Sequence, residues 1–241
     1  AGSADLFKMA DGLGEGKGYL TLPELNQKGV LHFFGTRSFD DTGVKQFGTR
    51  LKLRQVHGDR VVPYLSFTGG ENTPPTGDAW VTDQKGALIT VSTADCLPIL
   101  LIDPARSVAS AIHAGWRGSL LNIAGKAVAT MVRDYRSDPR SIWVGMGPAI
   151  GPCCFEVGPD VWQTVETKYR YGREVVSSRD GEKAKVDLAR LNRLHLLAAG
   201  LLPERIVSAG LCTVCRPDLF YSYRRDRTAG PGMISGVILN R

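Results

Sequence analysis

The chain has 241 residues, of which 43% are hydrophobic and 22% charged, and its formal net charge is +6. This apolar content is enough for one substantial core or two small ones. No charge-free window of about 20 residues is present, which excludes a helix that crosses a bilayer. The opening segment lacks a basic stretch followed by an apolar run, so we expect no signal peptide and a soluble, cytoplasmic protein.

The excess of positive charge is spread along the chain. Its densest run contains Arg224, Arg225 and Arg227, within YSYRRDRTAG. No zinc-finger spacing, recognition-helix pattern or RNA-binding aromatic signature accompanies this run. We therefore expect no nucleic acid and no membrane as a partner, while small anions such as phosphate suit the charge.

Apolar runs and alternation of apolar with polar residues predict the strands. The segment 51–58 alternates in this way and is predicted to be a strand that ends at His57. A strand-like run begins at Asp78, after a Pro/Gly/Thr loop at 69–77. The other predicted strands cover residues 31–36, 86–92, 96–102, 107–113, 141–148, 205–213 and 232–240.

Helical spacing of apolar residues predicts three helices. The first spans 119–135 with Ser119 as its N-cap, and the second spans 158–169. The third spans 187–201, with an aspartate at its start and a glycine at its end.

Strands and helices mix without strict βαβ alternation, which favours a single mixed α+β domain over a doubly wound fold. We expect one catalytic domain over residues 1–241, of which residues 1–28 form a loosely ordered N-terminal segment.

One thiol and two imidazoles stand out among the apolar segments. His57 and His113 each lie at a predicted strand end near a glycine, and Cys96 lies in STADC. A thiolate with two neutral imidazoles suits a zinc site that keeps a fourth position open. The long gaps between the three fit no short structural zinc motif, so ordinary buried residues remain the alternative. His32 and His195 have apolar neighbours and are predicted core residues.

The surroundings of His113 and Cys96 suggest an anion and a proton carrier. A predicted helix start follows His113, where free N–H groups favour an anion, and Arg117 adds a bidentate donor. Asp95 and Asp78 are carboxylates suited to orienting a histidine or handling a proton. On a strand, Asp95 and Cys96 would point to opposite faces, so both can face one pocket only if the strand bulges or ends there.

The other four cysteines form two local pairs. Cys153 and Cys154 are adjacent, and adjacent side chains seldom bind one metal or pair with each other without strain. We expect a turn there, with pocket lining as the alternative. Cys212 and Cys215 form a C-x-x-C, which needs a second pair at suitable spacing to make a structural zinc site, and the sequence indicates none.

Seven segments in one order resemble the YfiH-like family, also called the polyphenol oxidase or laccase-domain family and the purine nucleoside phosphorylase family. The segments are QVHG, GDAWVTD, STADCLPILL, HAGWRG, GPAIGPCCFEVG, DLARLN and FYSYRRD. The resemblance runs from about residue 30 to the end of the chain.

This resemblance implies a fold, a site and an activity. The fold is a single-domain α/β/β/α sandwich with mixed sheets, which also occurs in cysteine-dependent toxin hydrolases. The family's catalytic metal ligands fall on His57, Cys96 and His113; the metal is usually taken to be zinc, with copper as the alternative. The implied activity is phosphorolysis of adenosine, inosine, guanosine and methylthioadenosine, with adenosine deamination beside it. Purine nucleosides and phosphate are then the expected partners of a monomer or homodimer.

Two turns depart from the family pattern. TRSFDDTG keeps Arg37 but lacks the family's glycine pair. RRDRTAGPG keeps Arg225 but differs in its second half, so Arg227 and Thr228 are poor candidates for ligand contact. We predict Arg117, Arg37 and Arg225 as the candidate phosphate-binding residues. Asp95 is the candidate catalytic residue that carries the proton in deamination.

Three other functions are compatible with the same residues. A cysteine hydrolase would use Cys96 as a nucleophile activated by a histidine. A copper-dependent polyphenol oxidase matches one cysteine with two histidines, although four histidines in all are few for reducing oxygen. A basic, anion-seeking binding protein would show affinity without turnover.

Overall fold

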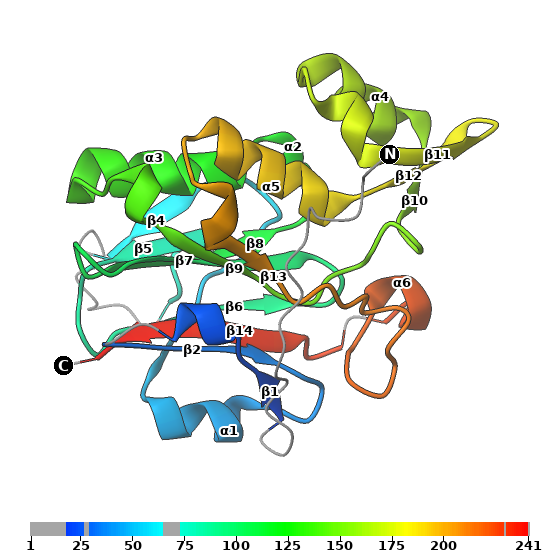
Figure 1. Ribbon diagram of the computed structural model, residues 1–241. Coiled ribbons are helices and arrows are strands. Elements are labelled where there is room, and N and C mark those ends of the chain that lie inside the picture. Colours follow the sequence, from blue (N-terminus) through cyan, green and yellow to red (C-terminus); the bar gives the residue numbers. More distant parts are fainter. Residues whose placement is uncertain (1–17, 27–28, 65–72, 229, 241) are drawn as a thin grey trace.

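Two β-sheets stacked face to face form the centre of the structure, a computed structural model (Figure 1). The structure describes residues 18–26, 29–64, 73–228 and 230–240. The N-terminal segment predicted to be loosely ordered lies mostly outside these residues, and so does part of the predicted Pro/Gly/Thr loop. Within the described ranges, every helix is too short or not apolar enough to span a bilayer.

The larger sheet has six strands and is buried on both faces. Its strands are β4 (Val61–Pro63), β5 (Ala79–Thr82), β7 (Leu97–Asp103), β8 (Val108–Ala114), β9 (Trp143–Met146) and β13 (Ile206–Ser208). Their order is β13-β9-β7-β8-β5-β4, with β7 and β8 antiparallel at the centre. Every residue of β7 and β8 is buried, which explains their nearly continuous apolar sequences.

The smaller of the two stacked sheets has five strands. These are β1 (Tyr19–Leu20), β2 (Val30–Gly35), β3 (Arg50–Leu51), β6 (Leu88–Thr93) and β14 (Met233–Leu239). Their order is β1-β2-β14-β6-β3, so β14 pairs with both β2 and β6. The connection from β6 to β7 therefore crosses from one sheet to the other.

Helices cover both outer faces of the sandwich (Figure 1). The helices are α1 (Asp41–Val44), α2 (Trp116–Leu120), α3 (Ile123–Tyr135), α4 (Pro159–Lys168), α5 (Leu188–Ala198) and α6 (Tyr223–Asp226). α2, α3 and α5 lie on the larger sheet, and α1 lies on the far side of the smaller sheet. Short 3-10 turns occur at Pro23–Leu25, Lys45–Phe47, Pro139–Ser141, Gly172–Val175 and Pro203–Arg205. The layers confirm the predicted α/β/β/α sandwich with mixed sheets.

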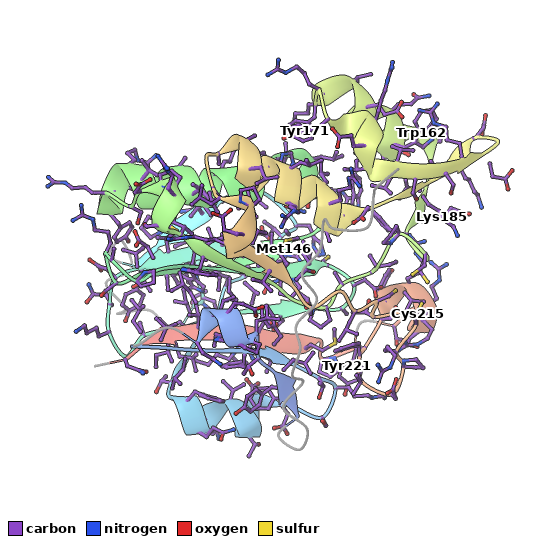
Figure 2. The ribbon with its side chains drawn as sticks, in the orientation of Figure 1. Met146, Trp162, Tyr171, Lys185, Cys215 and Tyr221 are labelled. Atoms are coloured by element: carbon purple, nitrogen blue, oxygen red, sulfur yellow. The ribbon has the colours of Figure 1, made fainter. Side chains whose placement is uncertain are left out.

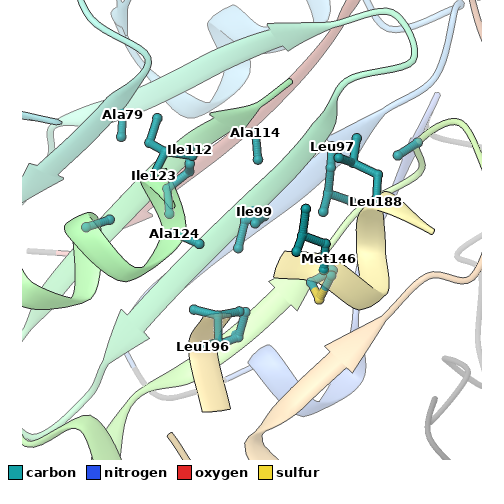
Figure 3. Packing of buried hydrophobic residues seen from close by; sticks show 14 of the residues in the cluster. Ala79, Leu97, Ile99, Ile112, Ala114, Ile123, Ala124, Met146, Leu188 and Leu196 are labelled. Atoms are coloured by element: carbon teal, nitrogen blue, oxygen red, sulfur yellow. The ribbon is translucent and has the colours of Figure 1, made fainter. Parts of the chain in front are cut away.

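Three apolar clusters fill the spaces between the layers. Under the helices, Ile99 and Ile112 from the larger sheet meet Ile123 of α3 and Leu196 of α5 (Figure 3). Between the sheets lies a second cluster that includes Leu100. A third cluster of aromatic and aliphatic residues joins α1 to the smaller sheet; its members are Phe33, Phe39, Val44, Leu88, Ile234 and Ile238.

A third, three-stranded sheet projects at one corner, next to α4 (Figure 1). It consists of β10 (Glu156–Val157), β11 (Val176–Asp180) and β12 (Lys183–Val186), in the order β10-β12-β11. The sequence did not predict this sheet, because four of the five residues of β11 are exposed and polar. Such a strand lacks the apolar alternation on which strand prediction depends.

The helix predicted over 119–135 is in fact two helices, and Ser119 is not a cap. Asn122 has left-handed backbone (φ 59°), and its side chain accepts a hydrogen bond from the N–H of Gly125 to cap α3. Ser119 lies inside α2, where its Oγ accepts a hydrogen bond from Asn192 Nδ2 at 2.8 Å. The third predicted helix is confirmed, because Asp187 caps α5.

Candidate metal-binding site and cleft

Three separate segments bring His57, Cys96 and His113 together. Their ligand atoms all lie within 4.8 Å of one another, and the two imidazole rings are 4.8 Å apart between centroids. His113 is on β8, Cys96 is in the turn that crosses from β6 to β7, and His57 is in the loop before β4. The three residues, which are far apart in the sequence, therefore lie close enough in space to bind one ion.

A buried carboxylate, Asp78, determines the shape of the His57 loop. Its oxygens accept hydrogen bonds from the backbone N–H groups of Val56 at 3.2 Å and of His57 and Gly58 at 2.9 Å. His57 has a φ of 60°. The predicted strand over 51–58 is therefore wrong beyond its first residue, because these N–H groups bond to a carboxylate and not to a neighbouring strand.

The same carboxylate orients His113. The two side chains are joined by a 2.8 Å hydrogen bond between His113 Nδ1 and Asp78 Oδ1. Burial opposes ionisation of Asp78, but hydrogen bonds from His113 and Gly58 outweigh it and hold the pKa of that carboxyl below its usual value. Nδ1 of His113 is thus committed to Asp78, and Nε2 is left to face Cys96. Metal-binding histidines are commonly held in this way.

Cys96 and His113 form an electrostatically coupled pair. Burial raises the pKa of the Cys96 thiol, but hydrogen bonds from His113 and His57 outweigh it and lower that pKa to about 7. For His113, burial lowers the pKa, while the bonds to Asp78 and Cys96 outweigh it and raise that pKa to about 9. The sulfur is therefore readily converted to a thiolate, which is the form that binds metals.

A glycine leaves the space in which the three side chains meet. A Cβ atom on Gly115 would lie 3.1 Å from Cys96 Sγ and 3.2 Å from His57 Cδ2. One thiolate and two imidazoles in this space are a donor set that fits a divalent metal such as zinc. Metal-binding histidines usually bond a carboxylate through the ring nitrogen that does not bind the metal, and Asp78 is that partner for His113.

Asp95 lies in the turn between β6 and β7, next to Cys96, and its side chain holds that turn in place. Its φ is 82°, and both Asp95 and Cys96 line the cleft, as expected if the strand ends there. One carboxylate oxygen accepts a hydrogen bond from Thr213 Oγ1 and the other from the backbone N–H of Arg224, both at 2.6 Å. Asp95 therefore ties the Cys96 turn to a segment more than 100 residues later in the chain.

The three candidate ligands open into a cleft of about 720 Å³, a size that suits a small-molecule ligand. Cationic and aromatic side chains contribute to its lining. These are Trp116, Arg117, Phe155, Tyr223, Arg224 and Arg227. Arg117 is exposed, and its guanidinium lies 4.4 Å from the centre of the Trp116 ring. α2 has only five residues, so Arg117, and not a helix end, supports the expected anion site.

Arg37 and Arg225 lie outside the residues that line the cleft. Arg37 donates to the carbonyl of Pro217 at 2.7 Å. Arg225 donates to the carbonyls of Thr213 and Phe220, both at 3.0 Å. Their positions do not support the predicted phosphate contacts.

Arg227 and Thr228, which were predicted to be poor candidates for ligand contact, both line the cleft, as does Arg224. Arg224 and Arg227 belong to the run RRDR, the densest basic segment of the sequence. Sequence alone could not show which members of that run face inward, because neighbouring residues in a helical turn point in different directions.

The other four cysteines also converge, contrary to the sequence analysis. One atom of each of Cys153, Cys154, Cys212 and Cys215 lies within 4.8 Å of the others. None of these residues lines the cleft described above. All five cysteines of the chain are free thiols.

Comparison with known proteins agrees with the motifs in the sequence. A family model described as "multi-copper polyphenol oxidoreductase laccase" matches residues 37–240. A protein of Xylella fastidiosa (strain 9a5c) named purine nucleoside phosphorylase is 40% identical over 181 residues, which cover 74% of this chain and 68% of the relative. The chain belongs to the YfiH-like, laccase-domain family.

One further relative and one solved structure agree with this assignment. Purine nucleoside phosphorylase YfiH of Escherichia coli (strain K12) is 35% identical over 181 residues, which cover 74% of this chain and 69% of that protein. The crystal structure of YlmD from Geobacillus stearothermophilus superposes with a TM-score of 0.85 at 26% identity, covering 98% of this chain and all of that one. The predicted family and architecture are confirmed.

Proposed function

We propose that this protein is a zinc-dependent purine nucleoside phosphorylase that also deaminates adenosine. The observation that carries the proposal is the meeting of His57, Cys96 and His113 in a cleft that arginine and aromatic side chains also line. The family relatives named purine nucleoside phosphorylase support the choice of substrate class.

His57, Cys96 and His113 would hold the metal, which supplies Lewis-acid chemistry to an atom of the substrate. Asp78 keeps His113 in the tautomer whose Nε2 is available as a ligand. Since Asp78 also holds the backbone of His57, one buried carboxylate positions two of the three ligands.

Phosphorolysis breaks the bond between the purine nitrogen and C1 of the ribose, and a phosphate oxygen forms a new bond to that carbon. The products are the free purine and ribose 1-phosphate. Arg117 and Arg227 line the cleft and provide guanidinium groups for the phosphate. Tyr223 lines the cleft, is 56% exposed and provides an aromatic face for the purine. Phe155 also lines the cleft but is buried, with the Arg224 guanidinium 5.6 Å from its ring centre.

Deamination replaces the amino group on C6 of adenosine by an oxygen from water and releases ammonia. The leaving amine must gain a proton, and Asp95 beside Cys96 is our proposed carrier. Because both of its oxygens also accept hydrogen bonds, Asp95 has a positioning role in addition.

The decisive experiment is to incubate the protein with adenosine, with and without phosphate, and to separate the products. Adenine that forms only with phosphate demonstrates phosphorolysis, and inosine demonstrates deamination. We expect Cys96→Ser to abolish both. A wild-type protein that retains zinc and forms neither product contradicts the proposal.

Two arginine variants test the anion site. Arg117→Gln removes a guanidinium from the cleft and should raise the KM for phosphate about 10- to 100-fold, the usual cost of a lost hydrogen bond to a charged group. Arg37→Gln, outside the cleft lining, is the matched control and should leave this KM unchanged.

A second candidate function, hydrolysis by a cysteine nucleophile, is favoured by one feature of the same site. Cys96, His113 and Asp78 form a chain of hydrogen bonds in the order nucleophile, base and orienting carboxylate. Such an enzyme would act without metal and would be inactivated by iodoacetamide after metal removal. Zinc-dependent turnover of nucleosides distinguishes the first function from this one.

A further inference from the structure

Two turns far apart in the sequence present four thiols to one another. The first turn contains Cys153 and Cys154, between β9 and β10, and the second contains Cys212 and Cys215, after β13. Figure 2 shows Cys215 near α6, at the edge of the sandwich. All four sulfurs are within reach of one central ion.

The sulfur spacing fits a tetrahedral site. Cys215 Sγ lies 3.7 Å from Cys153 Sγ and 3.5 Å from Cys154 Sγ. In a tetrahedron with zinc–sulfur bonds of about 2.3 Å, neighbouring sulfurs are separated by about 3.8 Å. A disulfide would require about 2.05 Å. The thiols are thus spaced as ligands of a shared ion and not as bonded pairs.

The backbone holds the two turns in a fixed arrangement. Ala149 pairs with Cys212 in a parallel bridge, and the N–H of Thr213 donates to the Ala149 carbonyl at 3.0 Å. The N–H of Gly151 points at Cys212 Sγ, 3.3 Å away. N–H groups aimed at sulfur stabilise a thiolate. A Cβ on Gly151 would make a tight contact of 3.3 Å with Cys153 Sγ, so this turn lies close against the sulfurs.

The adjacent pair can bind one ion because it lies in a turn. Adjacent cysteines seldom bind one metal without strain, and for that reason the sequence predicted no shared ion for this pair. Here Cys154 and Phe155 both donate their N–H groups to the carbonyl of Gly151, at 3.0 and 2.9 Å. This tight turn brings the sulfurs of Cys153 and Cys154 to the same side.

We propose that Cys153, Cys154, Cys212 and Cys215 form a second metal site, a closed four-thiolate site that takes zinc and has a structural role. Four protein ligands leave no open position, in contrast to the three-ligand site in the cleft. A tetrahedral set of four soft thiolate ligands suits zinc.

The position of this site indicates what it stabilises. The first turn continues directly into Phe155, which lines the cleft, and the second leads to Arg224, which also lines it. Arg224 donates to the carbonyl of Cys154 at 3.2 Å, and Thr213, between the two cysteines of the second turn, donates to Asp95. The ion would therefore fasten together two segments that form one wall of the cleft.

Metal counting on the full chain tests the proposal. We would purify the wild type and the Cys96→Ser, Cys215→Ser and doubly substituted variants anaerobically, and measure zinc per chain by mass spectrometry. We expect two zinc ions in the wild type, one in each single variant and none in the double variant. Cys96→Ser is the matched control, because the same substitution is made at the other site.

A spectroscopic measurement keeps the test valid even if Cys215→Ser fails to fold. The Cys96→Ser variant retains all four thiols, and Co²⁺ added after zinc removal should give the intense absorption of tetrahedral cobalt with thiolate ligands. Its four thiols should react with a disulfide reagent slowly when zinc is present and rapidly after chelation.

Two results would overturn the proposal. One is a folded Cys96→Ser variant that contains no zinc and does not take up Co²⁺. The other is a disulfide among these four cysteines, found by peptide mapping of the anaerobic protein, which would make the cluster a redox pair. Loss of zinc only from Cys215→Ser would support this site while contradicting the metal site in the cleft.

Discussion

Asp78 positions two of the three candidate metal ligands, although it is not among the residues that line the cleft. It is fully buried, and its two oxygens accept bonds from His113 and from three consecutive backbone N–H groups of the His57 loop. Loss of its charge would leave buried donors with poorer partners, which is among the more costly changes inside a protein.

We therefore expect Asp78→Asn to lower the free energy of unfolding by about 2 to 4 kcal/mol and to weaken metal binding about 10- to 100-fold. Urea unfolding and competition with a zinc chelator measure the two effects. Asp59→Asn is the control, since Asp59 pairs with Lys126 at the surface and its loss should cost less than about 1 kcal/mol. Equal effects of the two substitutions would show that Asp78 has no special role.

Gly115 is needed for space, since its φ of −68° is open to any residue. Gly115→Ala would press a methyl group between Cys96 and His57, and we expect zinc affinity to fall about tenfold or more with the fold retained. Chelator competition and circular dichroism check this. Gly230→Ala is the control, because its nearest neighbour would be an ordinary 3.6 Å away. Unchanged affinity in Gly115→Ala would contradict this account.

At the scale of elements, the sequence predicted what depends on local pattern. The apolar runs in β6, β7 and β8 are buried strands as expected, and Asp187 caps α5. The strand predicted over 51–58 was wrong because the apolar–polar alternation of this segment resembles that of a strand. Its shape is determined instead by the Asp78 carboxylate, which is distant in the sequence.

The family resemblance located the three candidate ligands, while their meeting in space depends on tertiary structure. No local pattern could show that the turn with Cys153 lies against the turn with Cys215. The two turns are brought together by the parallel pairing of β13 with β9. Roles that depend on such long-range contacts could not be assigned from sequence. For Asp78, the sequence left two roles possible, orienting a histidine or carrying a proton.

His195 joins three elements in its neutral form, which predicts a pH dependence of stability. Its Nε2–H donates to the carbonyl of Ser119 in α2 at 2.9 Å, and its Nδ1 accepts from the hydroxyl of Tyr171 at 2.6 Å. Burial lowers the pKa of His195 to about 4, from an ordinary value of 6.5. The unfolded chain therefore binds a proton between these values, where the folded protein does not.

Stability from this group is complete above about pH 6.5 and is lost as the pH falls toward 4. We expect the free energy of unfolding to fall between pH 7.5 and pH 5, and His195→Gln to reduce that fall by about 1 to 2 kcal/mol. Urea unfolding at both values checks this. Between pH 7.5 and 9 the two proteins should behave in parallel. An equal fall in both proteins at pH 5 would refute the assignment.

For the whole molecule, the apolar layer between the two sheets is a main source of stability. Leu100 is fully buried in this layer, so Leu100→Ala should cost about 2 to 5 kcal/mol. Leu121→Ala is the matched control, because Leu121 is 42% exposed and its truncation should cost less than about 1 kcal/mol. Urea unfolding measures both. Similar values would mean that the interface between the sheets is not closely packed.

The order of strands in the smaller sheet has a consequence for biosynthesis. Leu31 of β2 pairs with Ile238 of β14, and β14 also separates β2 from β6. A ribosome delivers β2 and β6 long before the strand that belongs between them, and such distant partners make pairing slow. Until β14 is made, β2 and β6 each have an unpaired edge, and unpaired strand edges make a nascent chain prone to aggregate.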